Sequence, residues 1–177
     1  THARKANPEA PTTSIEAELE KNATMPTHVV TVAGTRLISK TMAEITLIGL
    51  DAPVLGGDEF WYLMVPQACA PDEIGDGFTF NQLKSIPENR RPLAAYYTTR
   101  RRRPDDGEID LWIHLHHDAG VAGWAATVQV GATIALWGPR IAYNPPEGTN
   151  HHLLVADETG VPAVAAIAEA LPPDHPV

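Results

Sequence analysis

Cysteine is scarce in this 177-residue sequence, and both long apolar runs and an excess of basic residues are missing. The single cysteine, Cys69, excludes an intrachain disulfide and is typical of a reducing compartment, so we expect a cytoplasmic protein. No stretch approaches the roughly 20 apolar residues that a membrane span needs, and we see no apolar core of a signal peptide. With 13 basic and 22 acidic residues, the net charge of −9 argues against nucleic-acid binding.

The few basic residues are unevenly distributed along the chain. Arg90, Arg91 and the run from Arg100 to Arg103 account for six of the 13. One basic segment on an acidic protein favours a small anionic ligand, because a local positive field attracts anions. The alternative interpretation is the solvated end of a hairpin, since the turn-forming residues Pro104 to Gly107 follow the run directly.

Turn residues and short apolar runs divide most of the chain into an extension and a strand-rich part. Residues 1–27 form a peripheral extension, in which the capping-box spacing of Thr13 and Glu16 predicts a short helix. In residues 28–146, six β-branched or apolar runs predict strands at 29–32, 42–50, 60–65, 93–99, 108–116 and 132–137. A short helix is predicted from Val121 to Thr127. Six short strands separated by turns predict a mainly β fold, a six-stranded antiparallel Greek-key barrel.

The pattern changes after two consecutive prolines at 145 and 146. His152 to Ala156 is short and apolar, Asp157 to Gly160 is a polar turn, and Val161 to Leu171 is an alanine-rich helix. A strand, a turn and a helix in this order are typical of the opening of a parallel α/β unit. We therefore expect residues 147–177 to begin an α/β nucleotide-binding domain without completing it, because one strand cannot form a doubly wound sheet.

Two short motifs together describe a binding site for a flat ring joined to a diphosphate, as in FAD. In Tyr97-Thr98-Thr99-Arg100, a tyrosine can lie against a heterocycle, a hydroxyl can bond to its edge, and an arginine can neutralise a phosphate. Gly120-Val121-Ala122-Gly123 predicts the start of a short helix, whose free amides accept a pyrophosphate. Each motif alone is also ordinary composition for a strand or a turn.

The order and spacing of these motifs resemble those of siderophore-interacting proteins of the ferredoxin-reductase-like superfamily. That family has the pattern Arg-x-Tyr-Thr-x-Arg on a barrel strand, then a strand ending in His, a small-residue turn leading to Trp-Ala, and a Gly-Pro segment. The matching segments here are Tyr97 to Arg100, Leu115-His116, Gly120 to Ala125 and Leu136 to Arg140, followed by Asp157-Glu158-Thr159 after the predicted strand. Ala95 replaces the first arginine of the motif, and Arg91 or Arg102 is the candidate to take its place.

The resemblance implies an FAD site and an electron-transfer function. The implied FAD contacts are Tyr97, Thr98, Thr99, Arg100, His116, Gly120, Val121, Ala122 and Trp124. Within this set, Tyr97 and Thr98 would lie at the ring and Arg100 at a phosphate, while His116 and the 120–122 backbone would lie towards the ribityl-diphosphate-adenine side. Electrons would pass from NADPH or NADH through FAD to Fe(III) held by a siderophore, and iron would leave as Fe(II), with no catalytic side chain.

Arg101 and Arg103 are the implied contacts of an anionic ferric siderophore. Alternation along a strand predicts that these two side chains share one face, and that Arg100 and Arg102 share the other.

Three other functions are compatible with the same residues. They are a flavin- or siderophore-binding module without turnover, a general NAD(P)H:flavin or ferredoxin-type reductase, and a barrel used for protein interaction. His114 and His116 share a strand face and could ligate a metal together with a third group, while His117 points the other way. No third ligand stands at a recognisable spacing, so a metal site is not predicted. Cys69 lies in a loop-like stretch and is not expected to be a nucleophile.

Overall fold

The computed structural model describes residues 25, 27–67, 74–75, 77–116 and 119–173. Three sequence-based predictions fall outside these residues. They concern the helix in the N-terminal extension, the loop position of Cys69 and the direction of His117.

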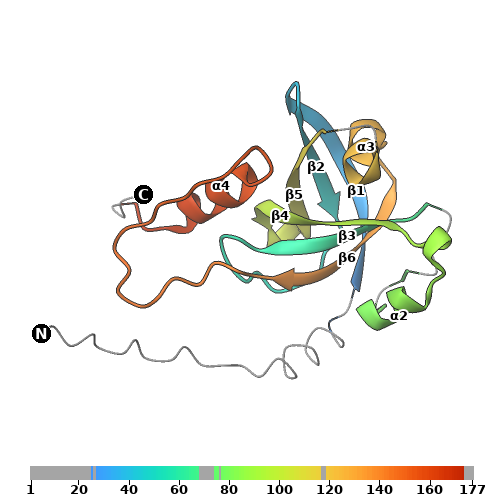
Figure 1. Ribbon diagram of the computed structural model, residues 1–177, viewed down its shortest axis with the longest axis horizontal. Helices are drawn as coiled ribbons and strands as arrows, with labels where there is room; N and C mark the ends of the chain where they lie inside the picture. The colour runs from blue at the N-terminus through green and yellow to red at the C-terminus, as the bar shows by residue number, and fades with distance from the viewer. Residues whose placement is uncertain (1–24, 26, 68–73, 76, 117–118, 174–177) are drawn as a thin grey trace, which may run out of the picture.

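Six antiparallel strands form a closed barrel in the order β1-β2-β5-β4-β3-β6 (Figure 1). The strands are β1 (Thr27–Ser39), β2 (Met42–Ile48), β3 (Phe60–Val65), β4 (Leu93–Arg103), β5 (Glu108–His114) and β6 (Thr133–Arg140). The prediction of a mainly β, six-stranded antiparallel barrel is confirmed. Strand β1 is much longer than predicted, because residues beyond Val32 pair with β2 in a hairpin that reaches Ser39↔Met42.

Alternating apolar side chains on the strands fill the barrel interior. The pairs Ile45↔Leu111 and Leu63↔Leu136 show how facing strands contribute matching positions to this core. Each large apolar side chain buried in this way stabilises the fold by about 1.5–3 kcal/mol. The fully buried members of the barrel core are Val32, Ile45, Leu47, Trp61, Leu63, Ile109, Leu111, Ile113 and Leu136.

Helices α2 and α3 and two short 3-10 turns lie around the barrel. Helix α3 (Gly120–Thr127) packs Val121 and Ala125 against the barrel core. Helix α2 (Phe80–Ser85) begins with a capping box between Thr79 and Gln82, and Leu83 then packs with Met64 and Trp137 in a second apolar cluster. The 3-10 turns are η2 (Glu88–Arg90), after α2, and η3 (Pro104–Asp106), which links β4 to β5.

Helix α4 (Val161–Ala170) confirms the predicted C-terminal helix and packs against β4, after a long connection that leaves the barrel and returns to it (Figure 1). Gly57 allows this close approach, because a Cβ there would lie 2.9 Å from the Cβ of Ala170 and 3.0 Å from the carbonyl oxygen of Ala166. Ile167 is buried in the contact. The helix is thereby held against the strand that carries the Tyr97 motif.

The prediction of a strand at residues 152–156 is wrong. This segment has no regular secondary structure, and Leu153 and Val155 are 89% and 83% exposed. A parallel strand needs neighbouring strands for its backbone hydrogen bonds and layers to cover its side chains. Among the described residues, no segment pairs with it, so its apolar composition is insufficient to form a strand.

Candidate functional site

The candidate site lies where β4 and β5 separate. The ladder between these strands runs from Thr99↔Leu111 to Arg103↔Glu108, whereas the first half of β4 pairs with β3, as in Tyr97↔Trp61. The end of β5 pairs instead with β2, as in His114↔Met42. Side chains from the first half of β4 therefore face the end of β5 across an opening in the sheet.

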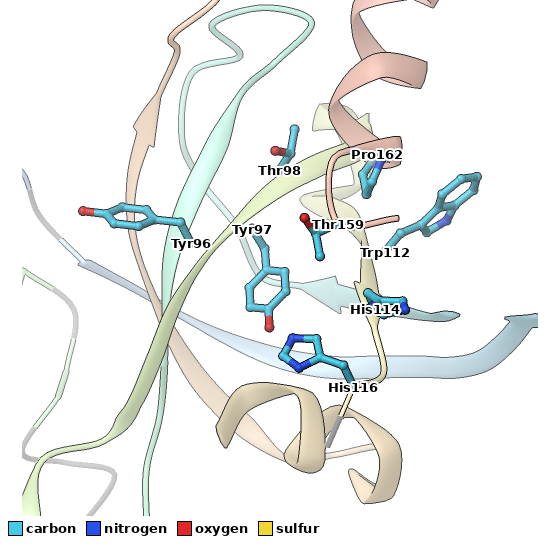
Figure 2. Close-up of a pocket in the computed structure, with 8 residues that line it drawn as sticks. All are labelled: Tyr96, Tyr97, Thr98, Trp112, His114, His116, Thr159 and Pro162. Atoms are coloured by element: carbon cyan, nitrogen blue, oxygen red, sulfur yellow. The ribbon is translucent and has the colours of Figure 1, made fainter. Parts of the chain in front are cut away.

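A pocket of about 140 Å³ occupies this opening. Figure 2 shows the phenol of Tyr97 pointing towards His116, while Tyr96 points in the opposite direction. Thr159 and Pro162, at the start of α4, close the pocket from a third side. The complete lining is Tyr96, Tyr97, Thr98, Trp112, His114, His116, Thr159 and Pro162. Three of the sequence-predicted contacts, Tyr97, Thr98 and His116, are thus brought together.

The polar groups of the pocket suit a flat heterocycle. Burial raises the pKa of Tyr97 above its usual value, so the phenol is neutral and can donate a hydrogen bond. The imidazoles of His114 and His116 lie 5.5 Å apart with an interplanar angle of 33°. The Nδ1 atom of His114 is buried and has no hydrogen-bond partner among the described residues. No group of three His, Cys, Asp or Glu side chains able to hold a metal was found in the part of the chain that the structure describes.

Thr99 does not line the pocket; its side chain is buried and belongs to a polar network. Its hydroxyl donates to Glu59 Oε1 at 3.1 Å and accepts from Trp61 Nε1 at 3.1 Å. Glu59 is fully buried, and Arg102 Nε lies 3.6 Å from Glu59 Oε1. This network fixes β4 beneath the pocket, which is a positioning role for Thr99. Sequence reasoning missed Glu59, because an acidic residue before a strand carries no distinctive signal.

The alternation predicted for the arginine run is wrong. Register shifts between Thr99 and Arg101, so Arg100 is an extra residue in a β-bulge. The guanidinium of Arg100 lies over Trp112 at 4.7 Å, whereas Arg102 approaches the buried ring of Trp61 at 5.9 Å. The bulge therefore places Arg100 and Arg102 on different faces of the strand.

Arg103 is engaged in ion pairs, and Arg101 is exposed. Arg103 donates to Glu108 at 2.5 Å and to both carboxylate oxygens of Asp110 at 2.6 and 2.7 Å. These hydrogen bonds raise the pKa of Arg103. Desolvation alone would raise the pKa of Asp110, but hydrogen bonds from Arg103 and Thr46 lower it below its usual value. The charge of Arg103 is therefore neutralised locally, and Arg101 is the member of the pair with an exposed side chain.

Arg100 forms a bidentate ion pair with Glu169 of α4. Nη1 and Nη2 of Arg100 lie 2.8 and 2.6 Å from the carboxylate oxygens of Glu169. The hydrogen bond raises the pKa of Arg100 and lowers that of Glu169. The guanidinium stands over Trp112, which lines the pocket. Arg100 thus sits beside the pocket, with a carboxylate where a phosphate was predicted.

A second cavity, of about 470 Å³, lies at the start of α3. Gly120 and Gly123 line it together with Trp124, Leu93 and Val65. Ala119 provides no side-chain cap, so the first amides of the helix are available to an anion. Gly120 has a φ of +67°, and a Cβ there would meet nothing within 4 Å, so its backbone is open to a ligand.

Val121 and Ala122 have buried side chains, and Trp124 packs against the barrel core. Their predicted contact with a cofactor can therefore come from the backbone of the first two and the exposed edge of the third.

Ala95 leaves no charge at the position of the family's first arginine, and neither Arg91 nor Arg102 is placed to supply one. Ala95 packs against the barrel core opposite Leu63. Arg91 donates to the carbonyl oxygens of Ile86 and Lys84, and Arg102 donates to that of Ala52. These contacts hold both guanidinium groups at other places in the fold.

No helix among the described residues is both long enough and apolar enough to cross a membrane.

Comparison with known proteins shows the family of this chain. Protein Rv2895c of Mycobacterium tuberculosis is 34% identical over 155 residues, which make up 84% of this chain and 55% of that protein. The NADPH-dependent ferric-chelate reductase of Escherichia coli is 38% identical over 87 residues, which make up 48% of this chain and 33% of the reductase. The chain therefore spans about half the length of the mycobacterial relative.

The structure of the siderophore-interacting protein SipS from Aeromonas hydrophila superposes with a TM-score of 0.63 and 26% identity, over 86% of this chain and 57% of that one. The model of the siderophore-interacting FAD-binding domain matches residues 31–143, which include all six strands in whole or in part as well as α3. The chain thus belongs to the siderophore-interacting FAD-binding domain family.

Proposed function

We propose that this chain binds FAD and is the flavin-binding part of a ferric-siderophore reductase, in which electrons pass from NAD(P)H to Fe(III) and iron is released as Fe(II). The observation that supports the proposal is the presence of two kinds of site on one barrel. One is a pocket with an aromatic ring, a hydroxyl and two imidazoles, and the other is the uncapped start of α3, which lines a larger cavity. A bound flavin would couple two-electron transfer from NAD(P)H to one-electron transfer to Fe(III). The protein would position the flavin and set its electrostatic surroundings.

The described residues fit the cofactor in the following way. Tyr97 would lie against the ring and Thr98 would bond to its edge, with His116 at the ribityl side; all three line the pocket. The amides of Gly120, Val121 and Ala122 would hold the diphosphate at the uncapped start of α3. The backbone at Gly120 is open, and the orphaned Nδ1 of His114 shows that the ring pocket has polar capacity that the protein does not use itself.

Entry of the ring requires a small outward movement at α4. The pocket of about 140 Å³ is smaller than the roughly 300 Å³ of a typical small-molecule site. Thr159 and Pro162 form the wall that must give way, and the Arg100–Glu169 pair holds that wall in place. If this pair were broken, the Arg100 guanidinium would be available to a phosphate, as the sequence motif predicts.

NADPH or NADH is the proposed electron donor, supported by the ferric-chelate reductase of Escherichia coli, which is described as NADPH-dependent. The domain that binds this donor would begin in residues 147–177, of which α4 is the helix that the structure describes. The second candidate is a flavin- or siderophore-binding module without turnover, which is favoured by the lack of a strand at 152–156 in the part of the chain that the structure describes. The single cysteine supports a cytoplasmic location.

The experiment compares two adjacent tyrosines that point in opposite directions. Replacing Tyr97 with serine should weaken FAD binding about threefold to tenfold, because the ring contact is lost. Replacing Tyr96 with serine is the matched control. Tyr96 is among the lining residues. Its ring, however, packs against Phe60 and Tyr62 and does not point towards His116 (Figure 2). Affinity is measured by quenching of flavin fluorescence. Equal affinities of the two variants would contradict the proposed ring site.

A further inference from the structure

His114 lines the ring pocket although no motif includes it. It is the last residue of β5, and strand alternation places it on the same face as Trp112 and near His116. Figure 2 shows its imidazole between these two side chains, facing the Thr159 turn. The position is fixed by the backbone ladder to Met42 of β2, so it does not depend on the side chain.

The unsatisfied atom of this imidazole is its most informative feature. Nδ1 of His114 is buried and has no partner among the described residues. A buried polar atom without a partner costs free energy, so such atoms are rare and each calls for an explanation, of which a bound water, ion or ligand is one. Neighbouring polar groups do not compete for it: Trp112 Nε1 donates to Glu44 at 2.8 Å, and Arg100 is held by Glu169.

We infer that His114 is a ring-contacting residue that makes this pocket specific for a flavin: its Nδ1 hydrogen-bonds to the edge of the flat heterocycle that lies against Tyr97. This inference rests on the proposed function. An imidazole presents a donor or an acceptor at Nδ1 according to its tautomer, which suits an edge on which carbonyl and ring-nitrogen groups alternate. The proposed diphosphate contacts at the start of α3 line the other cavity, and His114 is not among the residues that line it.

A carboxylate stands in the turn that carries Thr159, although it does not line the pocket. Hydrogen bonds from Thr159 lower the pKa of Asp157, and an electrostatic contribution from His114 lowers it further. Hydrogen bonds from the Thr159 hydroxyl and amide hold this carboxylate in place at 2.6 and 2.9 Å. His114 and Thr159 thus line the same pocket.

The test separates the ring from the rest of the cofactor with three probes: FAD, lumiflavin, which is the ring alone, and ADP, which lacks the ring. In the protein labelled with ¹⁵N at histidine, the imidazole resonances of His114 are assigned by their loss in a His114→Asn variant. We expect FAD and lumiflavin to shift these resonances and ADP to leave them unchanged.

Binding measurements on variants provide the second readout. His114→Phe should weaken both FAD and lumiflavin about threefold to tenfold and leave ADP binding unchanged. His114→Asn, whose amide reproduces the Nδ1 position, should restore affinity to within about twofold. His151→Phe is the control, because that histidine is exposed and bonds to Asn150 outside the pocket. Thermal unfolding confirms that each variant is folded.

Two outcomes would overturn the inference and leave the proposed function standing. One is FAD binding with unshifted His114 resonances, and the other is equal loss of FAD and ADP affinity in His114→Phe, which would mean a purely structural role. If the unaltered protein binds neither FAD nor lumiflavin, the proposed function fails together with the inference.

Discussion

Replacing Glu169 with glutamine should strengthen FAD binding, although Glu169 lies outside both cavities. Glu169 occupies both terminal nitrogens of Arg100 and holds α4 against the pocket. The Glu169 side chain is 59% exposed and that of Arg100 is 10% exposed, so solvent screens the pair and its contribution is about 0.5–1 kcal/mol. If FAD must displace this carboxylate, that free energy opposes binding. Its removal should lower the dissociation constant about twofold to fivefold.

The assay is a fluorescence titration with FAD at low ionic strength and again at high salt. Screening should reduce the difference between variant and parent at high salt. Glu147→Gln is the matched control, because it removes the same charge from an exposed loop position. Unchanged or weaker binding by Glu169→Gln, with Glu147→Gln equal to the parent, would refute the idea that Arg100 exchanges a carboxylate for a phosphate.

Two further predictions concern the outer face of β4 and β5. Asp110→Asn should lower the free energy of unfolding by about 1.5–3 kcal/mol near neutral pH. The pKa of Asp110 is lowered in the folded protein, so its contribution is present above the unfolded pKa and is lost as pH falls through the folded one. Urea unfolding between about pH 3 and 7 should therefore show the two proteins converging in acid, and a constant difference would contradict this reasoning. Arg101→Gln should slow reoxidation of the reduced flavoprotein by an anionic ferric siderophore at low salt and spare a neutral complex, because Arg101 is exposed. Equal rates with both complexes would leave Arg101 without a steering role.

The barrel could be predicted because its evidence is local. Alternation such as Ile45 and Leu47 in β2 needs no knowledge of the partner strand, and the turn at Pro104 to Asp106 marks a hairpin by its own chemistry. The two halves of the site could be located for the same reason. Tyr97 and the Gly120 turn each combine residue types that suit one part of a ring-diphosphate ligand.

The remaining features depend on pairing between distant segments, which no local pattern records. The bulge at Arg100 exists only in the register with β5, and it separates Arg100 from Arg102, which strand alternation had placed on one face. Glu59 becomes important only because Trp61, Thr99 and Arg102 converge on it inside the barrel. The apolar segment at 152–156 has strand composition, but among the described residues it lacks the neighbouring strand that would make it one.

The most direct test of the central claim is a titration of the purified chain with FAD, followed by its visible spectrum and the quenching of its fluorescence. The account predicts one FAD per chain, with a perturbed flavin spectrum. FMN should bind at least about tenfold more weakly, because it cannot place a diphosphate at the start of α3. A chain that leaves the spectrum and fluorescence of FAD unchanged would contradict the account.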